Sequence, residues 1–261
     1  MGSADLNLVL KLERHSALSW PATFVDTIYG WEIRRTPDIS SGRVNSVNAL
    51  APEPGMFDRV LLKARDLFDE QDEWPLVRIQ PLAGDEPVRR LESLGLHGQG
   101  ETVVKTMTLP AKRSAPSVAS VVSHALTADW MRAYGDAHDT AADERHAIAR
   151  ALGRVSVDQG FAVIYAEGRP VASGRGAVAD GVMGLFQIST LPDMRRRGFG
   201  RAIIEALIRW GQGQGATEAY LQVERKNEGA RALYRSFGFQ TAYDYSYWWV
   251  PDTVEIATKG S

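Results

Sequence analysis

The stretch Val182–Ala202, with the sequence VMGLFQISTLPDMRRRGFGRA, constrains the fold of this chain more than any other part. An apolar run ends at Thr190, Pro192 stops it, and a pattern of helical period begins at about Phe199. The spacing therefore predicts a strand, a short basic loop and a helix. The first N–H groups of a helix have no intrahelical partner and lie at the positive end of the helix dipole.

This loop is predicted to bind an anion with two linked phosphates. Gly198 and Gly200 have no Cβ atom, so an anion can approach the main-chain N–H groups closely. Four guanidinium groups add full positive charges around the same place. They belong to Arg195, Arg196, Arg197 and Arg201.

Two other interpretations of the loop stay open. A glycine pair beside an arginine run is also typical of a solvated turn that binds nothing. A dinucleotide-binding fold needs a third glycine three residues after Gly200, where Ile203 stands, although Glu224 lies near the position of a ribose-binding acid. A P-loop is excluded because no Gly-Lys-Ser/Thr follows.

A cluster of breaker residues at 109–117, LPAKRSAPS, indicates a boundary between two halves. We expect a domain of residues 1–110, a linker of residues 111–117 and a second domain of residues 118–261. In the first half, the patterns predict strands at 30–36, 43–50, 76–80 and 102–109, and helices at 56–70 and 86–94. In the second half, they predict strands at 118–122, 161–167, 169–177, 182–190, 219–223 and 243–250, and helices at 128–137, 143–152, 199–213 and 228–237. Both halves end in the order strand, helix, strand, helix, strand, which suggests an ancient duplication.

Composition restricts the chemistry. The chain has no cysteine, which excludes disulfides, thiolate metal sites and a cysteine nucleophile. Its five histidines form no metal-binding pattern, so we expect no metal. A net charge of −2 favours neither nucleic acid nor an anionic membrane as a partner. Without a signal peptide or an apolar run of the ~20 residues that cross a bilayer, a cytoplasmic protein is expected.

Two stretches resemble one known family. Residues 190–200, TLPDMRRRGFG, resemble the acyl-CoA signature of the GNAT superfamily of N-acetyltransferases, in which Arg or Gln, two residues, Gly, one residue and Gly or Ala follow a strand. Residues 227–239, NEGARALYRSFGF, resemble the Asn–Ala–Leu-Tyr–Gly-Phe segment of the same family. The resemblance covers about residues 117–251.

The resemblance implies a mixed α+β fold of the GNAT type, with a central, mostly antiparallel sheet flanked by helices and two GNAT-like halves in tandem. The first half resembles the N-terminal part of bacterial tandem GNAT-like proteins more loosely, in the segments Ser19–Pro21, Gly30–Trp31 and Arg43–Ser46. It has no Arg-x-x-Gly-x-Gly between a strand and a helix. We therefore expect it to be degenerate, to pack against the second half and to shape the acceptor site.

The function implied by the resemblance is transfer of an acetyl or other acyl group from acetyl-CoA to a primary amine, by direct attack in a ternary complex. A CoA-binding sensor or pseudoenzyme without turnover is the alternative. The acceptor is expected to be a small molecule or a peptide amine, and the protein a monomer or homodimer. The family's CoA-binding positions correspond here to Ile188, Ser189, Thr190, Arg195, Arg196, Arg197, Gly198, Phe199, Gly200, Arg201, Asn227 and Tyr234.

Two residues are candidates for catalysis. The resemblance implies that Tyr234 protonates the departing CoA thiolate, although periodicity alone makes it a core aromatic residue. An alkyl amine with a pKa of about 10.4 must lose a proton before it attacks, so a general base is needed. Glu224, just after the strand at 219–223, is the candidate base, and a surface carboxylate is its alternative role. Gln187 and Ser189 are candidates to position a water molecule.

Aromatic side chains alternate along the last predicted strand. Tyr243, Tyr245, Tyr247 and Trp249 are expected to share one face, with Trp248 on the other. Such a stripe is typical of a core or a domain interface. It is also able to wall an acceptor pocket for an apolar or cationic substrate.

Overall fold

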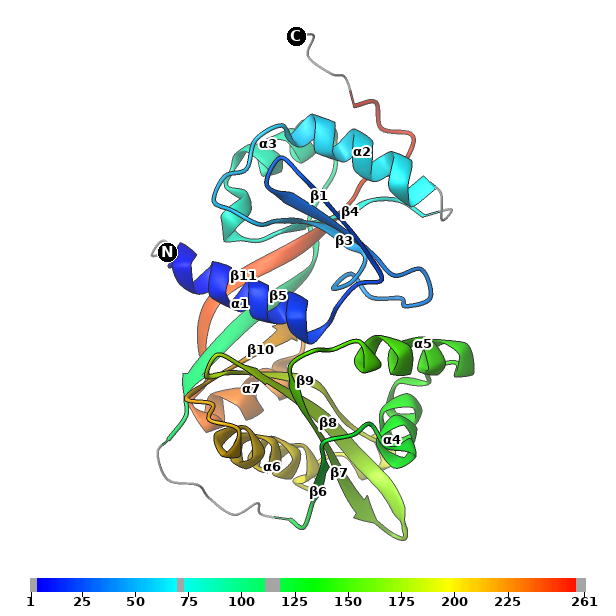
Figure 1. Ribbon diagram of the computed structural model, residues 1–261, viewed down its shortest axis with the longest axis vertical. Coiled ribbons are helices and arrows are strands. Elements are labelled where there is room, and N and C mark those ends of the chain that lie inside the picture. Colours follow the sequence, from blue (N-terminus) through cyan, green and yellow to red (C-terminus); the bar gives the residue numbers. More distant parts are fainter. Residues whose placement is uncertain (1–3, 70–72, 111–117, 257–261) are drawn as a thin grey trace.

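The computed structural model describes residues 4–69, 73–110 and 118–256, in which eleven strands form one sheet flanked by helices (Figure 1). The strand order is β1-β2-β3-β4-β11-β5-β10-β9-β8-β7-β6. The strands are β1 Phe24–Ile28, β2 Trp31–Arg35, β3 Ser46–Ala49, β4 Leu76–Ile79, β5 Gln99–Thr108, β6 Val121–Ser123, β7 Asp158–Ala166, β8 Arg169–Ala179, β9 Val182–Thr190, β10 Glu218–Glu224 and β11 Gln240–Trp249. The helices are α1 Leu6–Ser19, α2 Phe57–Asp69, α3 Glu86–Ser93, α4 Ala128–His138, α5 Ala142–Gly153, α6 Phe199–Gly213 and α7 Glu228–Phe237, with short 3₁₀ turns η1 Pro81–Ala83 and η2 Pro192–Met194.

The predicted order of the elements from residue 30 onward is confirmed, and so is the mixed α+β fold class. The first half contains β3-α2-β4-α3-β5 and the second contains β9-α6-β10-α7-β11 in the same sequence. Strands β7, β8 and β9 form the expected antiparallel meander. Parallel pairing occurs between β3 and β4 and between β9 and β10, at equivalent places in the two halves.

The centre of the sheet joins the halves by an exchange of strands. Strand β5, which ends the first half, pairs with β10 of the second half, and β11, which ends the second half, pairs with β4 of the first. β5 and β11 also pair with each other, antiparallel. The sheet therefore runs without interruption through both halves. The predicted linker, residues 111–117, lies outside the described residues, and the division of the chain into two domains stays a prediction.

Alternating side chains show which helices cover which face. In β7, Phe161 packs edge-to-face on Trp130 of α4, whereas Ala162 belongs to the core cluster that holds the buried side of α6. In β10, Tyr220 points toward His15 of α1, and its neighbours along the strand pack in the α6 cluster. Helices α1, α4 and α5 thus lie on one face, and α6 and α7 lie on the other.

Helix α1 and strand β1 were not predicted from the sequence. Asp5 caps α1, since its carboxylate accepts hydrogen bonds from the N–H groups of Asn7 at 3.0 Å and Leu8 at 3.2 Å. The buried side of this helix consists of Val9, Leu12, His15 and Ser19. Because half of these buried positions are polar, the apolar stripe on which helix prediction depends is too narrow to detect.

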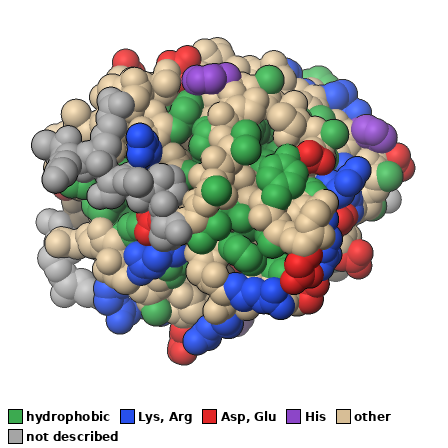
Figure 2. All heavy atoms as spheres, turned by 90° about the horizontal axis from the view of Figure 1, so that it is seen from below, with side chains coloured by type: hydrophobic (Ala, Val, Ile, Leu, Met, Phe, Trp, Pro, Cys, Tyr) green, Lys and Arg blue, Asp and Glu red, His purple; other side chains and the backbone are tan. Residues whose placement is uncertain are grey.

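The edge of the sheet in the second half lies at the lower end of the molecule in Figure 1, which Figure 2 shows from below. Hydrophobic side chains gather near the middle of that surface, with Lys and Arg side chains around them (Figure 2). Val121 of β6 and Tyr165 of β7 are among the exposed large hydrophobic residues of the chain.

Candidate functional site

Strands β9 and β10 diverge where the candidate site begins. They pair in parallel only as far as Leu185 and Leu221, although β9 continues to Thr190 and β10 to Glu224. On the other side of β9, the register with β8 shifts and Gln187 has a positive φ of 51°, which marks a β-bulge. Beyond Leu185, no described strand pairs with the edge of β9 that faces β10. An extended ligand is able to add to such an edge as a further strand would.

The bulge is held from both faces of the sheet. Gly174 of β8 lies opposite it, and a Cβ there would be 2.4 Å from Cγ2 of Ile203, so glycine lets α6 pack closely on the sheet. The Trp130 indole N–H donates to the carbonyl of Gly174 at 2.9 Å. Ser189 is buried, and its hydroxyl is 2.9 Å from that of Ser173, which ties the end of β9 to β8.

The loop between β9 and α6 presents main-chain N–H groups to solution. The first helical hydrogen bond of α6 runs from the N–H of Ala202 to the carbonyl of Gly198, at 3.1 Å. The N–H groups of residues 198–201 have no acceptor among the described residues. Gly198 has a φ of 83°, and a Cβ placed there would meet no atom within 4 Å. A Cβ at Gly200 would make only ordinary contacts, so this end of α6 is open.

Four arginines lie within and next to this segment, three in the loop at 195–197 and one, Arg201, in the first turn of α6. Arg196 has a φ of 63°, in the left-handed region, and its side chain is exposed. The hydrogen-bond and ion-pair partners of the other three are Thr190 for Arg195, Glu167 and the Asp193 carbonyl for Arg197, and Ser236 and Glu205 for Arg201. Exposed ion pairs of this kind contribute little to stability. An anion bound at the loop is therefore able to compete for these guanidinium groups.

Helix α7 places Tyr234 beside this region. Asn227 caps the helix, accepting a hydrogen bond from the N–H of Ala230 at 3.1 Å, and Gly238 ends it with a φ of 99°. Tyr234 is buried and packs edge-to-face on Phe239. Burial raises the pKa of its phenol to about 12, so the hydroxyl is protonated at neutral pH. No hydrogen-bond partner of this hydroxyl is found in the described part of the chain.

Glu224 ends β10 on the surface. Its side chain is 55% exposed, and its carboxylate lies 3.0 Å from the ammonium group of Lys226. Two residues earlier on the same strand, Gln222 is held by two other side chains. It accepts from the Tyr245 hydroxyl at 3.0 Å and donates to Ser16 at 3.2 Å.

A cavity of about 160 Å³ lies beside the bulge, and we call it the junction pocket. It is formed by the loop around Arg43 from the first half, by Tyr134 of α4, and by Arg175 and Gln187 of β8 and β9. The Arg175 guanidinium donates to the side-chain carbonyl of Gln187 at 2.9 Å. Sequence reasoning missed Arg43, Tyr134 and Arg175, because each stands alone in its segment and no local pattern marks it.

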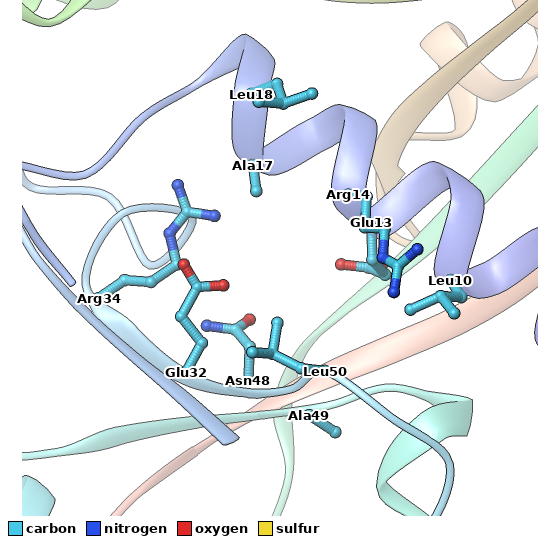
Figure 3. Close-up of a pocket in the computed structure, with 10 residues that line it drawn as sticks. All are labelled: Leu10, Glu13, Arg14, Ala17, Leu18, Glu32, Arg34, Asn48, Ala49 and Leu50. Atoms are coloured by element: carbon cyan, nitrogen blue, oxygen red, sulfur yellow. The ribbon is translucent and has the colours of Figure 1, made fainter. Parts of the chain in front are cut away.

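A larger cavity, of about 460 Å³, lies between α1 and strands β2 and β3 in the first half. Figure 3 shows the Arg34 side chain rising from β2 into this space toward α1. Leu10, Glu13 and Arg14 line it from the helix. Trp31, on the opposite side of the same strand, packs against α2 instead.

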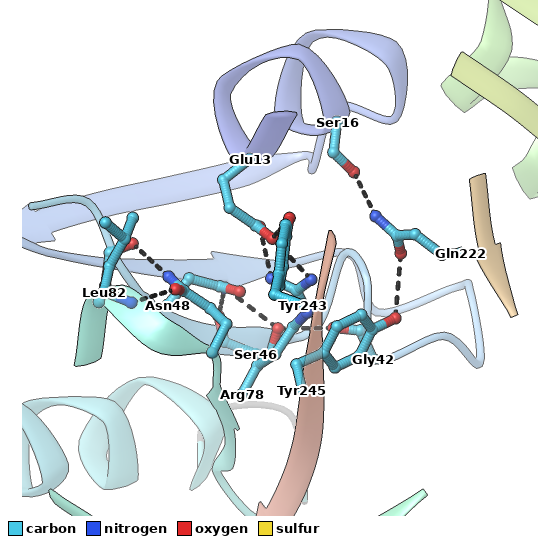
Figure 4. A network of polar contacts seen from close by, with 12 residues as sticks. Glu13, Ser16, Gly42, Ser46, Asn48, Arg78, Leu82, Gln222, Tyr243 and Tyr245 are labelled. Carbon is cyan, nitrogen blue, oxygen red and sulfur yellow. Dashed lines mark hydrogen bonds and ion pairs between the residues drawn. The ribbon is translucent and has the colours of Figure 1, made fainter. Parts of the chain in front are cut away.

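The aromatic stripe of β11 is part of a buried polar network that connects the two halves (Figure 4). Glu13 of α1 accepts two hydrogen bonds from Arg78 of β4, at 2.5 and 3.0 Å, and one from the Tyr243 hydroxyl at 2.6 Å. The Arg78 guanidinium also lies 3.7 Å from the centre of the Tyr245 ring. Tyr243 and Tyr245 thus share one face, as predicted, and that face is an interface between the halves. Trp249, by contrast, is largely exposed.

Two further features concern metal binding and membrane crossing. Among residues 4–69, 73–110 and 118–256, no group of three or more His, Asp and Glu side chains is placed to hold a metal ion. No helix in these ranges has the length and apolar character needed to cross a bilayer.

Comparison with known proteins gives matches along almost the whole chain. Residues 8–248 match the family described as "Probable histone acetyltransferase Rv0428c C-terminal". The "Uncharacterized N-acetyltransferase YobR" of Bacillus subtilis is 24% identical over 246 residues, 92% of this chain and 97% of the relative. A GCN5-related N-acetyltransferase from Kribbella flavida has the same fold, with 20% identity, 96% of each chain covered and a TM-score of 0.70. A tandem GNAT protein from the clavulanic acid biosynthesis pathway has a TM-score of 0.60 at 12% identity, over 100% of this chain and 98% of its own.

Proposed function

Since the chain belongs to the family described as "Probable histone acetyltransferase Rv0428c C-terminal" and is an acetyltransferase of the GNAT type, we propose that it transfers an acetyl group from acetyl-CoA to a primary amine. The two substrates meet in a ternary complex, since direct attack is the simplest route in a chain that has no cysteine to form an acyl-thiol intermediate. The second half, from residue 118, holds the CoA site. The first half is a degenerate copy that closes the acceptor side.

The observation that carries this proposal is the open N-terminus of α6. The unpaired N–H groups of residues 198–201 are arranged to hold the diphosphate, with the loop arginines adding charge around it. The pantetheine arm then follows the free edge of β9 along Ile188, Ser189 and Thr190. This path ends at the bulge, where the thioester lies between β9 and β10.

The chemistry is attack of a neutral amine on the thioester carbonyl carbon, followed by breaking of the carbon–sulfur bond. Main-chain N–H groups near the bulge polarise the carbonyl. Glu224 is the candidate base, acting through a water molecule, because its carboxylate stands at the end of β10 and is exposed to solvent. Gln187 lies at the same edge of the site and positions the acceptor.

Tyr234 acts on the leaving group. A phenol with a pKa of about 12 is a weaker acid than a thiol of ordinary pKa, about 8.5. Its main contribution is therefore a hydrogen bond to the sulfur as negative charge develops there. The phenol is free to make this bond, since its hydroxyl has no partner among the described residues.

Two measurements on the purified protein test this function. Calorimetric titration is expected to show one acetyl-CoA site, and thiol release from acetyl-CoA is expected to rise when an acceptor amine is added. Acetyl-CoA binding without thiol release in the presence of any amine would favour the alternative, a CoA sensor. The exposed position of Glu224, paired with Lys226, is the observation that keeps that alternative open. Absence of acetyl-CoA binding would contradict both.

A further inference from the structure

The junction pocket begins where the proposed thioester ends. Gln187, the bulged residue of β9, lines this pocket, and the next residue, Ile188, starts the strand edge assigned to pantetheine. Trp20 and Arg43 bring the first half of the chain into its wall. An acceptor held in this pocket would present its amine directly beside the thioester.

Two guanidinium groups give this pocket a positive charge. Arg43 and Arg175 both line it, and neither has a carboxylate within 4 Å among the described residues. Glu144 is the carboxylate found in its lining, and one of its oxygens accepts from the N–H of Ser40 at 3.3 Å, at the rim. The lining therefore carries two positive charges and one negative charge.

Arg175 contributes charge from beneath the pocket. It is completely buried, and its bonds go to uncharged acceptors on Gln187, Gln159 and Ser19, at 2.9, 3.1 and 2.9 Å. Burial, and to a smaller extent repulsion from Arg43, lower the pKa of Arg175 to about 9, so it stays charged at neutral pH. The bond to the side-chain carbonyl of Gln187 orients that residue, which makes Arg175 a positioning residue.

Arg43 is the more exposed of the two cations that line the pocket. Burial lowers the pKa of Arg43, but the Tyr245 and Tyr247 phenols raise it more, and the charge of Arg43 in turn lowers the pKa of the Tyr234 phenol. Its charge therefore acts both in the pocket and on Tyr234, the residue proposed to contact the leaving group. Phenols in their protonated form do not neutralise a guanidinium group.

Another guanidinium group between the two halves, that of Arg78, is buried and does have a carboxylate partner. Arg78 is fully paired with Glu13 through two hydrogen bonds (Figure 4). An unpaired buried charge is strongly destabilising, and proteins keep such charges mainly where function uses them. Arg175 is fully buried and Arg43 half-buried, so the absence of a carboxylate at both points to a negative group that a ligand supplies.

We propose that the acceptor is a primary amine that also carries a carboxylate, and that Arg43 binds this carboxylate in the junction pocket. The proposal rests on the function proposed above, because it places the thioester at the bulge. A cavity of about 160 Å³ has room for about five water molecules, since each occupies about 30 Å³ in the liquid. It suits an amino-acid-sized group, whereas the positive side chains of a basic protein tail would be repelled.

The test compares each amino acid with its carboxamide as acceptor in the thiol-release assay. The carboxamide keeps the amine and removes the negative charge. Its ammonium group is more acidic, so more of it is present as the neutral amine that attacks the thioester, and intrinsic reactivity favours the carboxamide. A kcat/KM at least tenfold higher for the amino acid than for its carboxamide, in the pair with the largest difference, is therefore evidence for carboxylate binding in the pocket. The same preference is expected in direct calorimetric binding of acid and carboxamide to the CoA-saturated protein, which does not depend on turnover.

Two variants and one control locate the preference. Arg43→Gln should raise KM for the acid about 10- to 100-fold, the range for loss of one charge-assisted hydrogen bond, and leave the carboxamide unchanged. Arg43→Lys keeps the charge and should retain most of the preference. Arg150→Gln is the matched control, since Arg150 is an exposed cation on α5 that is paired with Asp38 outside the pocket.

Acetyl-CoA affinity, measured on each variant, separates the two proposals. If the wild-type protein does not bind acetyl-CoA, both the proposed function and this inference are wrong. If acetyl-CoA binds but the carboxamides or cationic amines are preferred, or no acid in the panel binds or reacts, the carboxylate inference alone is wrong. The same conclusion follows if Arg43→Gln keeps the wild-type preference.

Discussion

Replacing Gly198 by alanine tests the open N-terminus of α6 with a single methyl group. Gly198 has a φ of 83°, and the new Cβ would meet no protein atom within 4 Å, so it would project into the space assigned to the diphosphate. A left-handed conformation costs alanine about 1–2 kcal/mol, which sets the expected loss in the free energy of unfolding. A phosphate oxygen kept away from the adjacent N–H groups would lose one or two charge-assisted hydrogen bonds, each worth about 1.5–3 kcal/mol.

Together these lost bonds predict acetyl-CoA binding weaker by about 1.5–6 kcal/mol, which is at least about tenfold. Gly215, just after the other end of α6, is the matched control: its φ is 87°, and a Cβ there would also meet no atom within 4 Å. Gly215→Ala should therefore lose the same stability in urea denaturation and keep wild-type acetyl-CoA affinity in calorimetry. Wild-type affinity in Gly198→Ala, or an equal loss in Gly215→Ala, would refute the assignment of the diphosphate site.

Three further predictions follow from buried groups. Tyr234→Phe should lower kcat at least tenfold and leave acetyl-CoA affinity unchanged, because the hydroxyl has no partner among the described residues; an unchanged kcat would remove its role. Burial lowers the pKa of His15 from 6.5 to about 4, so the protein has its full stability above pH 6.5, where His15 is neutral. As the pH falls toward 4, the free energy of unfolding should fall by up to about 3 kcal/mol. His15→Gln should reduce this pH dependence, measured by urea denaturation at several pH values. Glu13→Gln should lower the free energy of unfolding by about 3–5 kcal/mol, because it leaves Arg78 buried without a carboxylate, and a second change, Arg78→Met, should recover part of that loss.

Features encoded within short segments were predictable from the sequence. The strand, basic loop and helix of residues 182–213 were placed correctly, because the apolar periods and the breakers that separate them lie within one segment. The cap of α7 by Asn227 and its end at Gly238 follow from the same local rules. The roles assigned to the loop residues, Tyr234 and Glu224 stay predictions, which the experiments above test.

Helix α1 shows where local patterns fail. Two of its four buried side chains, His15 and Ser19, are polar and were given no weight as core positions. They are buried because the Tyr220 hydroxyl lies 3.0 Å from the His15 ring and the Ser19 carbonyl accepts from Arg175. These partners are about 150–200 residues away in the chain, so no window of sequence contains both members of a pair.

The sequence by itself determined the class of fold, the resemblance of its second half to one family, and the strand–loop–helix in which the free N–H groups lie, since these depend on residues close together in the chain. Only the tertiary structure decided that β5 and β11 exchange places between the halves and that Arg43 reaches the bulge beside Gln187. Strand exchange is a matter of non-local pairing, which local side-chain patterns do not specify. Whether a guanidinium group has a carboxylate partner can be judged only from its neighbours in the folded structure.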